Sequence, residues 1–135
     1  MTNQHKERSV LWVGSSRKDL KQFDEDVKDE IGHSLWKIQN GKFPHNVKQL
    51  KGFGSDGIYE ISARLNKDTY RTVIALKIDN EIYVLHCFKK KSKRGISTPQ
   101  SDINLIKQRI KAAKQRIKNE RVKENKDRGQ RRSGN

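Results

Sequence analysis

The sequence predicts an α/β protein of the α+β class, in which helices flank a meander of antiparallel strands. Apolar residues recur at helical spacing near the amino end and again near the carboxyl end. Between these two regions lie three stretches rich in β-branched and aromatic residues, separated by short turns. The 135 residues are enough for one domain, but only 31% of them are apolar, so the core must be small.

The first predicted elements are a short strand and two helices. Val10–Val13 is an apolar run that a glycine and two serines end. Ser16, with Asp19 three residues later, resembles a capping arrangement, so a short helix should run through Leu20. The apolar positions of a second helix recur every three or four residues, at Phe23, Val27, Ile31, Leu35 and Ile38. We therefore expect a helical hairpin after the first strand.

The middle of the chain predicts a β-meander. Residues 43–57 should form a glycine-rich loop, and the strands that follow are Ile58–Leu65, Thr69–Ile78 and Glu81–Phe88. Alternation along the second strand predicts one face with Tyr70, Thr72, Ile74, Leu76 and Ile78, and another with Arg71, Val73, Ala75 and Lys77. Asp79-Asn80 tolerates the positive φ of a tight hairpin turn, and Asn66-Lys67-Asp68 links the first two strands in the same way.

The last third predicts a basic loop, a helix and a tail. Lys89–Gly95 should form the loop, and Thr98 followed by Pro99 is typical of a helix start. The apolar seam of this helix consists of Ile103, Ile106, Ile110, Ala113 and Ile117. We assign the seam to the core rather than to a docking surface, because so few apolar residues are available. We predict one domain over residues 1–120 and a basic, disordered tail over residues 121–135.

The positive charge is concentrated in the last third of the chain. The formal net charge is +15, of which residues 1–86 contribute only +2 and residues 87–135 contribute +13. Such asymmetry favours a polyanionic partner, either nucleic acid or the ribosome. A solvated basic tail without a partner is the alternative interpretation, and it suits the last ten residues best.

Composition excludes several classes of protein. A single cysteine, Cys87, excludes a disulfide framework and a cysteine-based zinc site. No apolar run approaches the ~20 residues of a membrane span, and the amino terminus lacks a signal-peptide core, so we expect a cytoplasmic protein without membrane contacts. The histidines show no metal-ligand spacing and no phosphate-binding glycine loop is present, so we expect neither metal nor cofactor. His86 and Cys87 should point to opposite faces of a strand, which argues against a Cys–His dyad.

What remains is a set of basic and aromatic residues on the sheet and its loops. RNA cleavage by 2′-hydroxyl attack needs a proton acceptor, stabilisation of a phosphorane and charge or a proton for the leaving oxygen. Arginine and lysine supply the charge, and a lysine with a lowered pKa can accept the proton. The interleaved aromatic residues Tyr59, Tyr70, Tyr83 and Phe88 could stack on unpaired bases. From the residues alone, we favour the alternative that these cations merely solvate a sheet face or bind phosphate without cleaving it.

Motifs in the second half of the chain resemble a known family. They are, in order, Leu50–Gly54, Ile58–Ile61, Thr69–Val73, Ile82–Ser92, Thr98–Pro99 and Asp102–Ile103. Together they resemble the phage-derived, HigB-like branch of the RelE/ParE toxins of bacterial toxin–antitoxin modules, over about residues 10–118. The resemblance implies a RelE-like fold, with an N-terminal helical hairpin and a C-terminal helix packed on a curved antiparallel sheet.

The resemblance also implies a function. It implies the toxin of a type II toxin–antitoxin module, which acts as a ribosome-dependent mRNA endoribonuclease (an mRNA interferase) and inhibits translation. The implied partners are mRNA on the ribosome and a cognate helix-turn-helix antitoxin. Two alternatives stay open, a ParE-like toxin that inhibits DNA gyrase and a non-catalytic RNA-binding module.

By this resemblance, the catalytic candidates are Arg71, Arg64, Lys89 and Lys91. Arg71 follows Tyr70 in the second meander strand, as an arginine does in RelE-like toxins, and we assign it to phosphate stabilisation. Lys89 and Lys91 occupy the place of a family cation after the third strand. Arg64 stands two residues beyond a family arginine, which preserves the strand face. The candidates for RNA or ribosome binding are Lys51, Lys90, Lys93, Arg94, Lys107, Lys111 and Lys114.

Two further residues are assigned structural roles. We expect Glu60 to pair with a neighbouring cation. We expect His86 to pack in the sheet with one nitrogen satisfied, rather than to act as a general base. No tyrosine follows the basic loop, so the C-terminal tyrosine of some relatives has no counterpart here.

Overall fold

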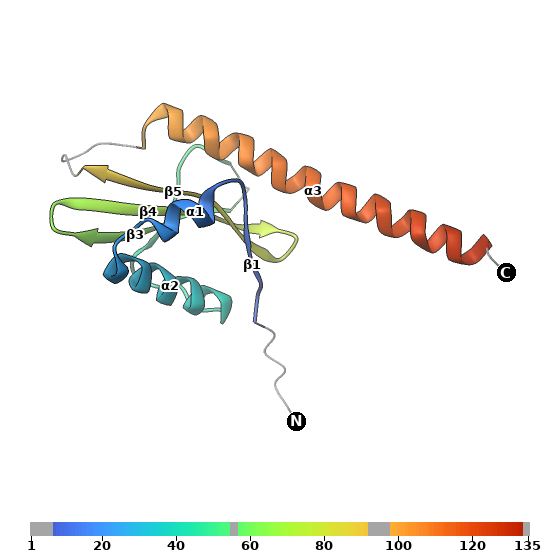
Figure 1. The fold of residues 1–135 in the computed structure, drawn as a ribbon, viewed down its shortest axis with the longest axis horizontal. Helices are drawn as coiled ribbons and strands as arrows, with labels where there is room; N and C mark the ends of the chain where they lie inside the picture. Colours follow the sequence, from blue (N-terminus) through green and yellow to red (C-terminus); the bar gives the residue numbers. More distant parts are fainter. Residues whose placement is uncertain (1–6, 55–56, 92–97, 134–135) are drawn as a thin grey trace, which may run out of the picture.

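A five-stranded sheet with helices on both faces forms the molecule, and this confirms the predicted α+β fold (Figure 1). The computed structural model describes residues 7–54, 57–91 and 98–133. Its elements are β1 (Val10–Trp12), α1 (Ser16–Lys21), α2 (Glu25–Gln39), β2 (Val47–Gln49), β3 (Ile58–Leu65), β4 (Asp68–Ile78), β5 (Glu81–Lys91) and α3 (Gln100–Ser133).

The strands lie in the order β1-β5-β4-β3-β2. The central meander is as predicted, and Asn66, Asp79 and Asn80 adopt the positive φ that its two turns require. Two features differ from the prediction. β1 pairs in parallel with β5, so the sheet is mixed rather than antiparallel, and the predicted loop over residues 43–57 contains the edge strand β2. A three-residue strand is too short to show alternation, and its pairing with β3 is what orders it.

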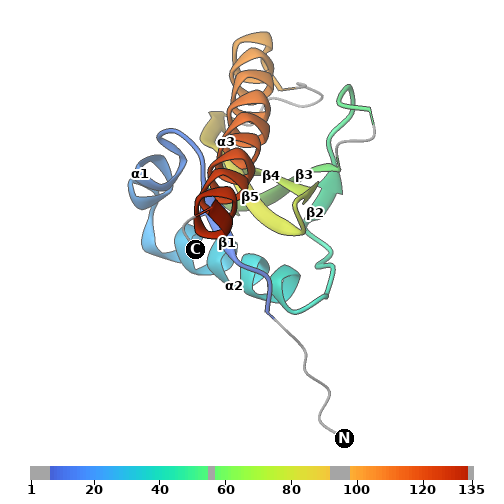
Figure 2. The same cartoon turned by 90° about the vertical axis from the view of Figure 1, so that its right-hand side faces the viewer.

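The two long helices cover opposite faces of the sheet (Figures 1 and 2). We name these the α2 face and the α3 face, each defined by its cluster of packed side chains. β1 shows the division clearly, because Val10 and Trp12 pack against the α2-face cluster while Leu11 packs against the α3-face cluster. The short helix α1 lies against β5. The result is a three-layered arrangement of helix, sheet and helix.

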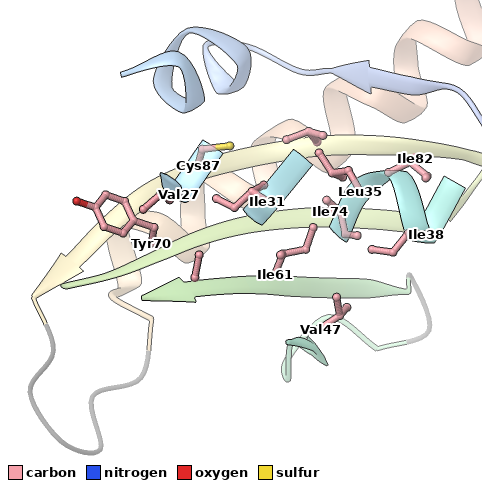
Figure 3. Close-up of a cluster of buried hydrophobic side chains, with 12 residues drawn as sticks. Val27, Ile31, Leu35, Ile38, Val47, Ile61, Tyr70, Ile74, Ile82 and Cys87 are labelled. Carbon is pink, nitrogen blue, oxygen red and sulfur yellow. The ribbon is translucent and has the colours of Figure 1, made fainter. Parts of the chain in front are cut away.

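The α2 face is the cluster drawn in Figure 3. Four of the five predicted apolar positions of this helix are buried there, at Val27, Ile31, Leu35 and Ile38, and they pack over the sheet. Phe23 precedes α2 and is partly buried against the same cluster. Fully burying an apolar side chain of this size contributes about 1.5–3 kcal/mol, so α2 is held by packing rather than by helix propensity.

Strand β4 departs from simple alternation near its end. As predicted, Tyr70, Ile74 and Leu76 pack on one face, while Val73 and Ala75 pack on the other. The predicted face of Ile78 is wrong, because this residue belongs to the α3-face cluster with Val73. The pairing of β4 with β5 shifts register between Ala75 and Ile78, and an irregularity of this kind rotates the later side chains to the other face.

Helix α3 is longer than predicted. Its seam residues Ile106, Ile110, Ala113 and Ile117 are buried against the α3 face, which confirms their assignment to the core. We predicted a disordered tail from Arg121, whereas the helix continues to Ser133. The segment is rich in Lys and Arg, which are good helix formers, so the helix can extend without further packing. The division of the chain at residue 120 stays a prediction.

Candidate nucleic-acid interface

Arg71 lies on the α3 face and forms an ion pair with Glu60 of the adjacent strand. Its Nη1 atom is 3.0 Å from Glu60 Oε1 and 3.1 Å from Oε2. The same atom is 3.5 Å from the hydroxyl oxygen of Thr98, just before α3. The arginine side chain is 21% exposed and that of Glu60 only 10%. The pair confirms the structural role predicted for Glu60, and it presents a fixed guanidinium at a partly open surface.

Lys90 lies on the same face as Arg71. It pairs in register with Thr69, two residues before Arg71 along β4. Partial burial lowers the pKa of the Lys90 ammonium, and the positive charge of Arg71 lowers it further, while Glu60 and Asp102 act in the opposite direction. A lowered pKa makes a lysine a better proton acceptor. Lys90, predicted above as a binding residue, therefore lies on the face of Arg71 with its pKa shifted in the direction that a proton acceptor needs.

Lys89 lies on the opposite side of the sheet. Its Nζ atom is 3.0 Å from Asp68 Oδ2 and 5.6 Å from the ring centroid of Tyr70, whose side chain belongs to the α2-face cluster. The hydrogen bond to Asp68 raises the pKa of Lys89, and the charge of Asp68 raises it further. Because β5 continues to Lys91, residues predicted as a loop alternate across the sheet, and this separates Lys89 from Arg71.

The other predicted site residues of the sheet and its loops fall into three groups. Arg64 is exposed on β3, opposite Thr69 in register and on the same strand face as Ser62, which pairs with Arg71. Lys51 is exposed in the turn after β2. Lys91 pairs with Asp68 in the backbone register, while Lys93 and Arg94 lie outside the described residues.

The predicted cations of α3 form an exposed row beside the buried seam. Lys107, Lys111 and Lys114 follow one another at intervals of four and three residues, so they occupy one side of the helix. All three are exposed, and each directly follows a buried seam residue. The row therefore borders the α3 face and offers positive charge to an extended polyanion.

Arg109 forms a clasp between α3, β5 and the segment before α1, which sequence reasoning missed. Its Nη1 atom donates to the Leu85 carbonyl oxygen at 2.8 Å, and its Nη2 atom donates to Ser15 Oγ at 2.9 Å. Gly14, at a φ of +57°, lies against the guanidinium, where an added Cβ would come within 2.7 Å of Nε. In the sequence, nothing distinguishes Arg109 from the other cations. The only signal of a close approach by another side chain is the Gly14-Ser15 pair, far from Arg109 along the chain.

The Arg109 guanidinium also contacts His86. The Nε2 atom of His86 lies 2.7 Å from Asp102 Oδ1, and its Nδ1 atom lies 3.4 Å from Arg109 Nη1. Because a guanidinium can only donate, Nδ1 is the acceptor and Nε2–H donates to the carboxylate. The ring stacks on Phe88 at a centroid distance of 4.8 Å. This arrangement confirms the prediction of a packed histidine with a satisfied nitrogen.

Most of the sequence matches a known protein family. Residues 18–111 match the family described as Phage derived protein Gp49-like (DUF891). The chain belongs to this family. The match confirms the resemblance to the phage-derived branch that the motifs indicated.

Among solved structures, this Gp49-like protein is similar to the toxin–antitoxin complex RelBE2 from Mycobacterium tuberculosis. The sequence identity is 16%, the TM-score is 0.43, and the alignment covers 67% of this chain and 100% of that chain. No curated protein sequence matches significantly.

The Gp49-like region contains most of the site described above. It includes Glu60, Arg71, Lys90, Asp102 and Arg109, but it excludes β1 and the part of α3 beyond residue 111. Within the described ranges, no group of His, Cys, Asp and Glu side chains could hold a metal ion. No helix of that part of the chain is long and apolar enough to cross a membrane.

Proposed function

We propose that this Gp49-like protein is the toxin of a type II toxin–antitoxin module and that it cleaves mRNA on the ribosome. The observation that carries the proposal is the position of Arg71, which is fixed by Glu60 at a partly exposed surface beside Lys90. Membership of the phage-derived family and the motif resemblance support the toxin role. A cognate helix-turn-helix antitoxin is the corresponding protein partner.

The residues of the α3 face can perform cleavage by 2′-hydroxyl attack. Lys90, once it has lost its own proton, accepts the proton of the 2′-hydroxyl, and the 2′-oxygen forms a bond to phosphorus. The bond from phosphorus to the 5′-oxygen breaks, that oxygen takes a proton from water, and a 2′,3′-cyclic phosphate remains. Arg71 stabilises the charge that develops on the phosphorane oxygens, because its guanidinium keeps its charge and matches phosphate geometry. Arg64, on the same strand face, adds a second cation.

Docking on ribosomal RNA is assigned to the exposed cations around this face. Lys107, Lys111 and Lys114 line one side of α3, and Lys51 lies in the turn after β2. Phosphate contacts of this kind release counterions, so affinity should fall steeply as salt increases. An affinity for ribosomes that hardly changes with salt would contradict this assignment.

The decisive experiment compares Arg71→Ala with Lys67→Ala. Both variants remove one positive charge, but Lys67 is exposed in the turn between β3 and β4, whereas Arg71 is partly buried and pairs with Glu60. Primer extension on mRNA in a purified translation system would measure cleavage. We expect Arg71→Ala to lose about 10²-fold or more of the cleavage rate, with Lys67→Ala close to wild type. Circular dichroism would check that both variants fold.

The two alternative functions, gyrase inhibition and RNA binding without cleavage, predict different results for the same protein variants. A gyrase inhibitor would block DNA supercoiling in vitro and cause DNA damage in cells, and Arg71→Ala would leave both effects unchanged. An RNA-binding module would retain salt-sensitive binding to ribosomes without producing cleaved message. Either result, together with no cleavage by the wild-type protein, would overturn the proposed activity.

A further inference from the structure

A groove lies between the second half of α3 and the hairpin turn that joins β4 to β5. Its volume is about 390 Å³, and its lining includes residues from both elements. The apolar part of the lining consists of Ile78, Ile117 and Val122. The basic part consists of Lys77, Lys114, Lys118 and Arg121. At this end of the molecule α3 projects beyond the sheet (Figure 1).

Val122 is the unusual residue of this groove. It is 58% exposed, whereas Ile117, a little more than one helical turn earlier, is buried in the α3-face cluster. The two other large hydrophobic residues that are exposed in the described chain, Trp36 and Phe43, each contact a neighbouring ring. Val122 lines the groove together with the buried Ile78 and Ile117, so its exposed apolar side chain lies inside a concave site, where a partner molecule can cover it.

The charged residues around the groove are almost all basic. Its single acidic residue is Asp79, whose Oδ1 atom lies 2.9 Å from Arg121 Nη2. Both side chains of this ion pair are well exposed, so the pair contributes little stability, and another carboxylate can replace Asp79. The stem of Lys77 is held against the backbone of Gly57, where an added Cβ would come within 2.6 Å of Lys77 Cγ. The rim therefore offers positive charge around an apolar floor.

We propose that this groove binds an acidic segment of a partner protein. An apolar side chain of the segment covers Val122 and Ile117, and its carboxylates pair with the rim, one of them replacing Asp79 at Arg121. A polynucleotide would satisfy the rim cations but would leave the apolar floor exposed, so the observations favour a protein. The proposal does not depend on RNA cleavage, since the groove lies outside the Arg71 cluster; it shares only Lys114 with the row of α3 lysines proposed to dock on ribosomal RNA.

The test uses the full-length protein and a displayed library of random 12-residue peptides. Peptides are selected on immobilised wild-type protein, and an enriched peptide is then synthesised with a fluorescent label for anisotropy. We expect enriched peptides to combine acidic residues with one or two large apolar residues. Val122→Ser removes the exposed part of the apolar floor without a change of charge, and binding should weaken by about tenfold, as for an anchor residue.

Three further variants separate the groove from general electrostatic attraction. Asp79→Asn removes the competing carboxylate and keeps a residue that tolerates the turn, so binding should become tighter. Lys118→Gln, on the rim, should weaken binding, whereas Lys111→Gln, on α3 but outside the groove, should have a much smaller effect. The proposal is overturned if no peptide is enriched, if Val122→Ser binds as wild type does, or if the two lysine variants weaken binding equally. Displacement of the peptide by polyuridylate from wild type and Val122→Ser alike would indicate an RNA surface instead.

Discussion

Glu60 places a carboxylate 3.0 Å from the Arg71 guanidinium, on the sheet face that α3 covers. The carboxylate orients the arginine, but it also neutralises part of the charge that a phosphate would meet. A substitution at Glu60 can separate these two effects, because Gln keeps the shape that orients Arg71 and removes the charge that neutralises it.

Glu60→Gln should tighten the binding of RNA and loosen the fold. The amide can still accept a hydrogen bond from Arg71, but it no longer compensates the positive charge. We expect the slope of log affinity for ribosomes against log salt concentration to become steeper by about the amount that one phosphate contact contributes. We also expect a loss of about 1–2 kcal/mol in the free energy of unfolding, because a charge-assisted hydrogen bond becomes a neutral one. Unchanged salt dependence would show that Arg71 does not meet phosphate.

Arg109→Ala should destabilise the protein without affecting a surface that binds RNA. The variant leaves the Leu85 carbonyl and His86 without their donor and removes the link to Ser15. We expect a loss of about 2–3 kcal/mol, measured by urea unfolding. Lys107→Ala is the matched control, since this exposed lysine lies on the same helix, and its effect should stay within about 0.5 kcal/mol.

Cys87 should be inert in the folded protein. Burial raises the pKa of its thiol to about 12, although a hydrogen bond from Thr72 acts in the opposite direction. The thiol therefore stays protonated at pH 8, and we expect reaction with a disulfide reagent only after unfolding in guanidinium.

The same pKa shift predicts how stability changes in alkaline solution. Above pH 9 the unfolded chain ionises this thiol while the folded chain does not, so ionisation favours unfolding up to about pH 12. Cys87→Ala should remove this part of the pH dependence, and equal alkaline slopes for wild type and variant would contradict the assignment.

Truncation after Glu120 tests the predicted domain boundary. The described side chains beyond Ile117 are exposed, and the removed segment contributes the surface ion pair between Arg121 and Asp79. We expect the shortened protein to fold with a loss below about 1 kcal/mol in thermal unfolding. Binding to the acidic peptide described above should be lost, because Val122 and Arg121 line its groove. Failure of residues 1–120 to fold would contradict the predicted domain.

The sequence by itself determined the elements whose signal is local. The helical spacing from Val27 to Ile38, the meander and its Asp79-Asn80 turn, and the buried seam of α3 follow from periodicity and turn chemistry along neighbouring residues. The pairing of a cation with Glu60 and the packed state of His86 were also predictable, because burying either group requires a partner.

Tertiary structure alone decided which segments meet and where the regular alternation of a strand begins and ends. The parallel pairing of β1, the edge strand β2 and the clasp of Arg109 on Ser15 join residues far apart in the chain, which no local pattern reports. Because β5 extends to Lys91, Lys90 lies on the same face of the sheet as Arg71, and Lys89 lies on the opposite face. The physical reason is that strand side chains alternate, so the length and register of a strand, which are set by packing against its neighbours, decide on which side each charge lies.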